Sequence, residues 1–219
     1  MFIGHYAAAL AAKSAEPRAP LWTFVAGCQA LDIAWSALLI VGVEKVRFDP
    51  ALPGSDLDLY FMPYSHSLPA ALIWSVAAAI LALWVLKLSR RAAIFVGLVV
   101  FSHWLLDFLV HRPDLELWFG GPKVGLAWWN QPVPEMIVEM GLLALAGAAW
   151  VAQRKGASRA AWPAVLFIAV LVAVQWIGAQ TPGGGDAQSL GAMALATYLG
   201  LTTISVFVDR AGRSVGLAA

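Results

Sequence analysis

The fold is decided by the stretch Phe101-Ser102-His103-Trp104-Leu105-Leu106-Asp107-Phe108-Leu109-Val110-His111. If this stretch is helical, His103, Asp107 and His111 recur every four residues and project from one face. Imidazole and carboxylate groups stacked in this way suit a metal site or a proton relay. The residues between them are almost all apolar, and ionisable groups inside a membrane helix are by default functional. The stretch therefore predicts a membrane helix that carries a functional face.

The composition of the whole chain is that of a membrane protein. The chain has 219 residues, of which 61% are hydrophobic and 12% are charged, whereas a soluble domain has about 25% charged residues. Six apolar stretches are long enough to cross a bilayer, which takes about 20 helical residues. These predicted spans are 21–43, 68–86, 92–111, 133–152, 162–178 and 190–208. The sequence predicts an all-α polytopic membrane helical bundle.

We expect one integral membrane domain over residues 1–219, with the site in 1–152 and accessory helices in 160–210. The longest connection, 44–67, is too short to bury a core of its own. Residues 2–12 form an apolar run of roughly 18 Å as a helix, which is too short to span. This run is either a half-span that carries His5 toward the middle of the bilayer or an interfacial helix that leaves His5 in water.

The basic residues predict the orientation in the membrane. Ten of the fourteen Lys and Arg residues lie before the first span, in the second and fourth connections, and after the sixth span. Basic residues concentrate in cytoplasmic loops. We therefore expect a multi-pass protein of the bacterial inner membrane with both termini in the cytoplasm. The acidic connection 44–67 then faces outward, and nothing in this distribution indicates nucleic-acid binding.

Further ionisable residues occur at matching depths in the other spans. Asp32 and His103 each lie roughly 18 Å from the cytoplasmic end of their spans, at 1.5 Å per residue. His66 lies at the mouth of the second span, between serines that can cap the start of a helix. Glu139 lies nearly two turns below the outer boundary, close in depth to Asp107. We therefore expect one shared site in the outer half of the membrane.

The candidate site contains all four histidines of the chain. Its members are His5, Asp32, His66, His103, Asp107, His111 and Glu139. Histidine and carboxylate ligands without cysteine suit Zn²⁺, or Mn²⁺ or Fe where carboxylates dominate. An open position on such an ion holds a water whose pKa is lowered toward neutrality, next to a substrate in the bilayer.

Four short motifs resemble a known family. They are Ile3-Gly4-His5, Ala30-Leu31-Asp32, Tyr64-Ser65-His66-Ser67 and Ser102-His103-Trp104-Leu105-Leu106-Asp107. Their order and spacing, over about the first 120 residues, are similar to those of the YdjM-like bacterial inner-membrane metal-dependent hydrolases. The resemblance implies a metal held by the residues at His5, Asp32, His66, His103 and Asp107.

The chain departs from the family pattern at two motifs. Leu31-Asp32-Ile33-Ala34-Trp35 stands where the family has Pro-Asp-x-Asp-His, and Tyr64-Ser65-His66-Ser67 keeps only the end of a His-Arg-Gly-x-Thr-His-Ser run. These losses favour a mononuclear site or a lost activity. His111 and Glu139 could replace the missing ligands.

We therefore expect one divalent metal, with Zn²⁺ ahead of Mn or Fe. His111 and Glu139 are the candidate general base and acid. The expected reaction is metal-assisted hydrolysis of a lipid-linked or amphiphilic ester or phosphoester.

Two other functions are compatible with the same residues. The first is a transporter or proton relay across the outer half of the membrane. The second is a structural or haem-binding subunit with His66 and His103 as axial ligands. The last two spans contain no ionisable residue, so we expect them to pack within the bundle or to mediate a homo-oligomer or a membrane complex.

Overall fold

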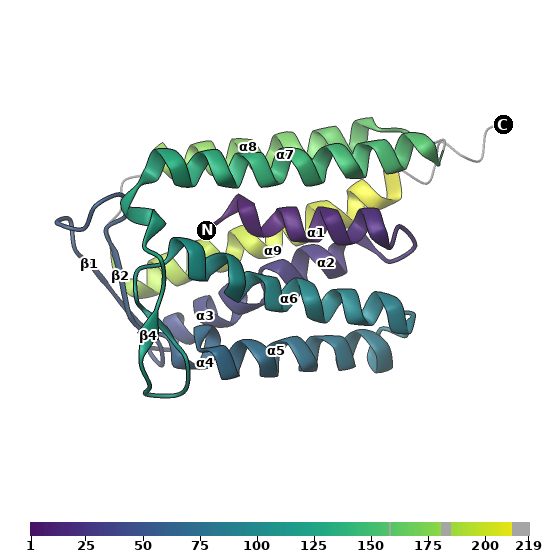
Figure 1. Ribbon diagram of the computed structural model, residues 1–219. Helices are drawn as coiled ribbons and strands as arrows, with labels where there is room; N and C mark the ends of the chain where they lie inside the picture. The colour runs from purple at the N-terminus through teal and green to yellow at the C-terminus, as the bar shows by residue number, and fades with distance from the viewer. Residues whose placement is uncertain (158, 181–184, 212–219) are drawn as a thin grey trace.

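A bundle of long helices forms the body of the protein (Figure 1) in the computed structural model, which describes residues 1–157, 159–180 and 185–211. Within these residues, five helices are long and apolar enough to cross a membrane, and a bent pair of shorter helices gives a sixth. The five are α5 (Leu68–Ile80) with its π-helical continuation η1 (Leu81–Val85), α6 (Arg90–Val110), α7 (Pro132–Gly156), α8 (Trp162–Gln180) and α9 (Ala187–Ala211). The predicted all-α membrane bundle is confirmed.

The first predicted span is bent rather than straight. It consists of α2 (Leu21–Cys28) and α3 (Ala30–Ile40), which meet at an angle of 54°. In an unbroken helix the Cys28 carbonyl would accept a hydrogen bond from the backbone four residues later. Here the Gln29 carbonyl accepts from the Ile33 N–H, and the Cys28 carbonyl accepts from a side chain of α6. Irregular backbone at membrane depth is tolerated where protein buries it, and Gln29 is fully buried.

The N-terminal helix α1 (Ile3–Ala15) is a half-span inside the bundle, not an interfacial helix. It lies alongside α7, α2 and α6 (Figure 1), and its residues Ile3, Tyr6 and Leu10 have no exposed surface. The helix begins in the interior of the bundle and ends at the end that is rich in basic residues. A cytoplasmic location of both termini stays a prediction. Met1 lies buried inside the bundle next to Asp107, and residues 212–219 at the other end lie outside the described residues.

A carboxylate of α9 holds the basic end of the bundle together. Asp209 Oδ1 lies 2.9 Å from Lys13 Nζ of α1, and Asp209 Oδ2 accepts the backbone N–H of Leu21 at 2.8 Å. That N–H belongs to the first turn of α2, where no intrahelical partner exists. Asp209 therefore joins the end of α1 and the start of α2 to α9.

The opposite end carries short hairpins and helical turns. The strands β1 (Lys45–Phe48) and β2 (Leu57–Phe61) pair antiparallel, as do β3 (Leu115–Glu116) and β4 (Lys123–Val124). The short helix α4 (Pro63–His66) precedes α5, and the 3-10 turn η2 (Trp128–Asn130) precedes α7. Arg112 fixes the β1–β2 loop, because its guanidinium donates to the carbonyls of Pro53, Ser55 and Leu57.

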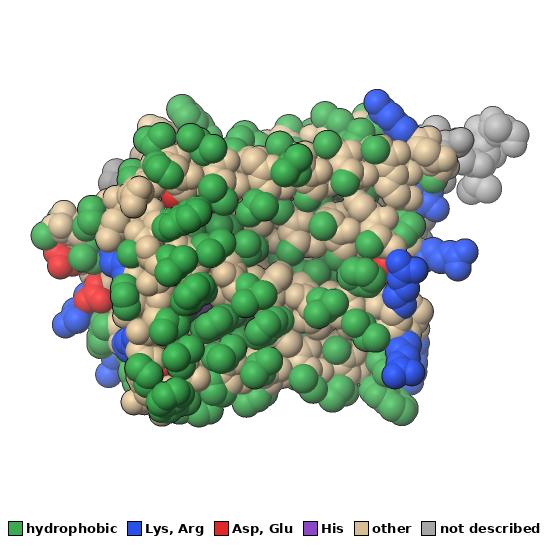
Figure 2. All heavy atoms as spheres, viewed as in Figure 1, with side chains coloured by type: hydrophobic (Ala, Val, Ile, Leu, Met, Phe, Trp, Pro, Cys, Tyr) green, Lys and Arg blue, Asp and Glu red, His purple; other side chains and the backbone are tan. Residues whose placement is uncertain are grey.

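The outer surface of the bundle is apolar over its length. Trp84, Leu145 and Trp176 are 66%, 74% and 68% exposed. Figure 2 shows hydrophobic side chains covering the middle of the molecule and charged side chains gathered at the two ends. Apolar surface of this extent marks contact with lipid. The bilayer is therefore the environment of the helices.

Close packing of small residues brings α9 next to the helix that carries Asp32. A Cβ atom at Gly191 would lie 2.8 Å from the Ser36 carbonyl oxygen of α3. Only glycine allows this approach without a shift of the backbone. The contact places α9 beside the site described below.

Candidate metal centre

Six ionisable side chains from four parts of the chain meet in the half of the bundle near the hairpins. His103 and Asp107 lie one turn apart on α6, His111 follows the last turn of α6, and the others come from α1, the first turn of α3 and the end of α4. They are His5, Asp32, His66, His103, Asp107 and His111. The histidines and Asp107 are at most 4% exposed. The structure thus brings together all five predicted ligands and His111.

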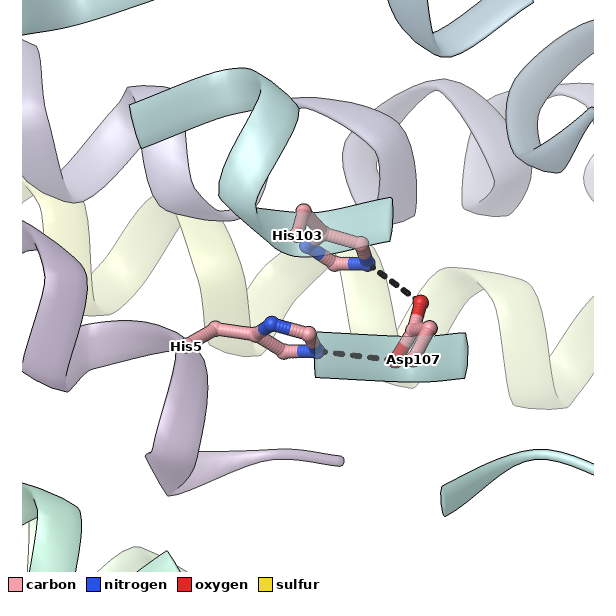
Figure 3. Close-up of side chains that lie close together, drawn as sticks. All are labelled: His5, His103 and Asp107. Carbon is pink, nitrogen blue, oxygen red and sulfur yellow. Dashed lines mark ion pairs between the residues drawn. The ribbon is translucent and has the colours of Figure 1, made fainter. Parts of the chain in front are cut away.

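Asp107 is the centre of the group. Its Oδ1 lies 3.1 Å from His5 Nε2 and 3.5 Å from His111 Nε2. Its Oδ2 lies 3.0 Å from His103 Nε2 and 3.5 Å from His66 Nε2. Figure 3 shows the stacked rings of His5 and His103, each with one nitrogen toward Asp107. The Nε2 atoms of all four histidines therefore face one carboxylate.

Asp32 completes the group on one side. Its Oδ1 lies 3.4 Å from His66 Nε2 and 3.6 Å from His103 Nε2. Two ligands of a tetrahedral zinc ion, each bonded at 2.0–2.1 Å, are roughly 3.4 Å apart. The nitrogen–oxygen distances among Asp32, His66, His103 and Asp107 run from 3.0 to 3.6 Å. Two overlapping sets of three, His5 with His103 and Asp107, and Asp32 with His66 and His103, therefore have ligand atoms close enough to hold an ion.

The hydrogen bond of His103 fixes its tautomer. Its Nδ1 lies 2.7 Å from the carbonyl oxygen of Cys28, and a carbonyl only accepts, so Nδ1 carries the proton. If the ring is neutral, Nε2 carries a lone pair and no proton, and it faces Asp107 Oδ2 at 3.0 Å. Neither of these two atoms has a hydrogen-bond partner among the described residues. Two buried acceptors this close repel each other, so Nε2 either carries a second proton or shares a metal ion with Asp107. The pair is therefore compatible with a bound metal ion.

His66 is oriented by a buried chain of hydrogen bonds. Its Nδ1 lies 2.7 Å from Ser65 Oγ, and the Ser65 hydroxyl donates to Glu44 Oε2 at 2.6 Å. The hydroxyl has one proton, so His66 Nδ1 must donate to it, which leaves Nε2 free to bind a metal. Metal-binding histidines are commonly held by such carboxylate partners. Sequence reasoning missed Glu44, because it precedes Ser65 by 21 residues and no local pattern connects them.

His111 and His5 are held in different ways. His111 Nδ1 lies 2.9 Å from Asp114 Oδ1, and its ring packs on Trp129 with centroids 4.1 Å apart. His5 stacks on His103 with ring centroids 3.7 Å apart, and neither of its nitrogens has a hydrogen-bond partner among the described residues. Three of the four histidines therefore have an acceptor at Nδ1 and present Nε2 to Asp107.

Glu139 supports the half-span. Its carboxylate accepts the backbone N–H groups of Phe2 at 3.0 Å and Gly4 at 2.9 Å. Both N–H groups lie at the start of α1, where a negative charge also interacts favourably with the helix dipole. Glu139 thus joins α7 to the helix that carries His5, and a role for it in proton transfer stays a prediction. The Met1 amino group, just before α1, lies 3.3 Å from Asp107 Oδ1.

A cavity of about 730 Å³ extends from the site to the surface. Asp32, His66, Asp107 and His111 line its inner part, and Glu139 lines it from α7. Its other walls come from the β1–β2 loop and from residues of α7, α8 and α9. Its volume is in the range of small-molecule sites, about 300–1,000 Å³. The last two helices thus form a wall of the cavity, which their apolar sequences did not predict.

Comparisons of the chain with protein-family models, with curated proteins and with solved structures found no match.

Proposed function

We propose that this protein is a membrane-embedded metal-dependent hydrolase. One observation carries the proposal: the Nδ1–H of His103 donates to Cys28, which turns its Nε2 toward a buried oxygen of Asp107 at 3.0 Å. The ligands are His5, Asp32, His66, His103 and Asp107. Imidazoles and carboxylates favour Zn²⁺, with Mn²⁺ or Fe as alternatives. The same residues support a relationship to the YdjM-like hydrolases.

When bound, a divalent ion at such ligands lowers the pKa of a coordinated water and polarises an ester or phosphoryl oxygen. His111 lines the cavity, and Asp114 holds its Nδ1, so we assign proton transfer at Nε2 to His111. Glu139 is second in this role, because its carboxylate already accepts two backbone N–H groups of α1.

The walls of the cavity support an amphiphilic substrate. Ile177 of α8 and Met193 of α9 line the cavity and are 63% and 56% exposed on the apolar surface. Gly54 and Asp56 of the β1–β2 loop line the same cavity at the hairpin end. A molecule bound there reaches both lipid and water, so we propose a lipid-linked or amphiphilic ester or phosphoester.

We place the protein in the bacterial inner membrane with its basic end in the cytoplasm. The hairpin end, with the mouth of the cavity, then faces outward. In this orientation the reaction takes place in the outer half of the membrane.

Metal analysis of the full chain purified in detergent tests the proposal. We expect about one Zn²⁺ per chain, and we expect His103→Ala and Asp107→Asn to lose it. Gln175→Ala is the matched control, because Gln175 lines the cavity without contacting a histidine of the site. Absence of stoichiometric metal, or metal retained in both ligand variants, overturns the proposal. A haem absorbance band in the wild-type protein would instead favour a haem-binding subunit.

A further inference from the structure

The charged side chains that line the cavity are all acidic or histidine. The carboxylates come from α3, α6, α7 and the β1–β2 loop. They are Asp32, Asp56, Asp107, Glu135 and Glu139. No Lys or Arg side chain is among the described residues that line this cavity. The Met1 amino group also lines the cavity, but it lies 3.3 Å from Asp107 Oδ1 and is paired there. An anionic head group therefore needs further positive charge in this cavity.

The basic side chains near the mouth are engaged with the fold. Arg112 donates to Leu57 O at 3.0 Å and to two further loop carbonyls, and Lys123 Nζ donates to Tyr60 O at 2.6 Å. Arg47 Nη2 lies 2.8 Å from Asp58 on the neighbouring strand. These cations stabilise the hairpins and do not neutralise the carboxylates of the cavity.

Three of the five carboxylates already have a role in the fold or the site. Asp32 and Asp107 face the histidines, and Glu139 holds the start of α1. Glu135 lies one turn before Glu139 on α7 and is 8% exposed. The carboxyl groups of Glu135 and Glu139 lie close enough to share a hydrogen bond through one proton. A cation at Glu135 can replace this shared proton and interact with both carboxylates.

Aromatic side chains and the outer loop line the same cavity as Glu135. Trp35 and Trp129 line the cavity, and the buried Nε1–H of Trp35 has no acceptor among the described residues. Gly54, with φ +79°, packs so closely on the Trp129 carbonyl that no larger residue fits. The same glycine lies beside Pro132, three residues before Glu135. Aromatic faces attract ammonium groups, and an indole N–H can donate to an ester or phosphate oxygen.

We infer that the substrate carries an ammonium group in its head, bound at the mouth by Glu135 and Trp129. This inference rests on the proposed function and names the substrate class of the same site. The ester or phosphodiester lies next to the histidines, within reach of Trp35. The apolar chain lies along α8 and α9, beside Ile177 and Met193.

Two lysolipids with the same acyl chain test the inference. Lysophosphatidylethanolamine and lysophosphatidylglycerol share a phosphodiester and differ in the presence of an amine. We expect the full chain in lipid nanodiscs to bind the amine-containing lysolipid about tenfold more tightly. Glu135→Gln should reduce this ratio to about twofold or less without changing metal content. Asp186→Asn, an exposed carboxylate at the start of α9 outside the cavity, should keep the wild-type ratio.

Equal binding of the two lysolipids by the wild-type protein overturns the inference, as does a preference that survives Glu135→Gln. If that variant does not fold, the wild-type ratio and Asp56→Asn, which should lower the ratio, decide the question. The outcome is separate from that of the proposed function. Metal without an amine preference refutes only the substrate class, and an amine preference without metal refutes only the hydrolase.

Discussion

His103 of α6 donates its Nδ1–H to the carbonyl oxygen of Cys28 across 2.7 Å. The bend between α2 and α3 makes this bond available, because a straight helix would use the same carbonyl internally. The bend also places Asp32 in the first turn of α3, where its Oδ1 lies 3.6 Å from His103 Nε2. One interruption of a membrane helix therefore orients His103 and also places Asp32, which are two of the proposed ligands.

Cys28→Ala should leave metal binding almost unchanged. Its thiol donates to Val25 O within the same helix, and only its carbonyl contacts His103. We expect the metal dissociation constant to stay within about twofold of wild type. Competition with a chromogenic chelator measures it. A loss of metal as large as that of His103→Ala would mean that the thiol itself is a ligand.

Glu44→Gln should weaken metal binding by about 10–100-fold while all ligands remain. The variant removes the negative charge to which the Ser65 hydroxyl donates. Ser65 then no longer holds His66 Nδ1 in place, so the orientation of His66 Nε2 is less well fixed. The same chelator competition provides the measurement. Glu116→Gln is the control, since Glu116 is also buried at the hairpin end but accepts from the Gly120 backbone N–H. Equal effects of the two variants would show a general loss of stability.

Glu139→Ala should destabilise the protein by about 1 kcal/mol, because it removes the acceptor at the start of α1. Glu139→Gln keeps an oxygen acceptor and should retain most of the stability. Thermal unfolding in detergent measures both variants. If Glu139 is instead the general base, Glu139→Gln will abolish turnover and leave unfolding unchanged.

Removing the metal should lower the thermal stability of the wild-type protein. An ion that binds only the folded state at a hundred times its dissociation constant contributes about 2.7 kcal/mol. We therefore expect a chelator to reduce the melting temperature and added Zn²⁺ to restore it. Asp107→Asn should show neither change, and a wild-type protein insensitive to the chelator would contradict a structural contribution of the ion.

The sequence was sufficient to predict the membrane fold and to predict which ionisable side chains of the helices lie together. Apolar length identified the spans, and spacing of four residues placed His103 and Asp107 on one face of α6. The number of residues from the cytoplasmic end of each span predicted that Asp32 lies at the same depth in the membrane as His103. Span length, helical face and depth all follow from counting residues along a single helix, so the hydrophobic periodicity of the sequence reveals them.

The remaining parts depend on tertiary contacts that periodicity does not encode. The bend at Gln29 occurs within a run of good membrane residues. Glu44 acts on His66 across a hairpin, and the part of the cavity wall formed by α9 depends on the close approach of Gly191 to α3. Each of these needs the packed structure, because the partners are far apart in sequence.

The attachment of α1 and α2 to Asp209 has a mechanical consequence. The helix α1 is fastened a second time at its start, where Glu139 of α7 accepts two of its backbone N–H groups. Any tilt or slide of this short helix would break one of the two attachments. The imidazole of His5 is therefore clamped at a constant height between them, although α1 does not cross the membrane.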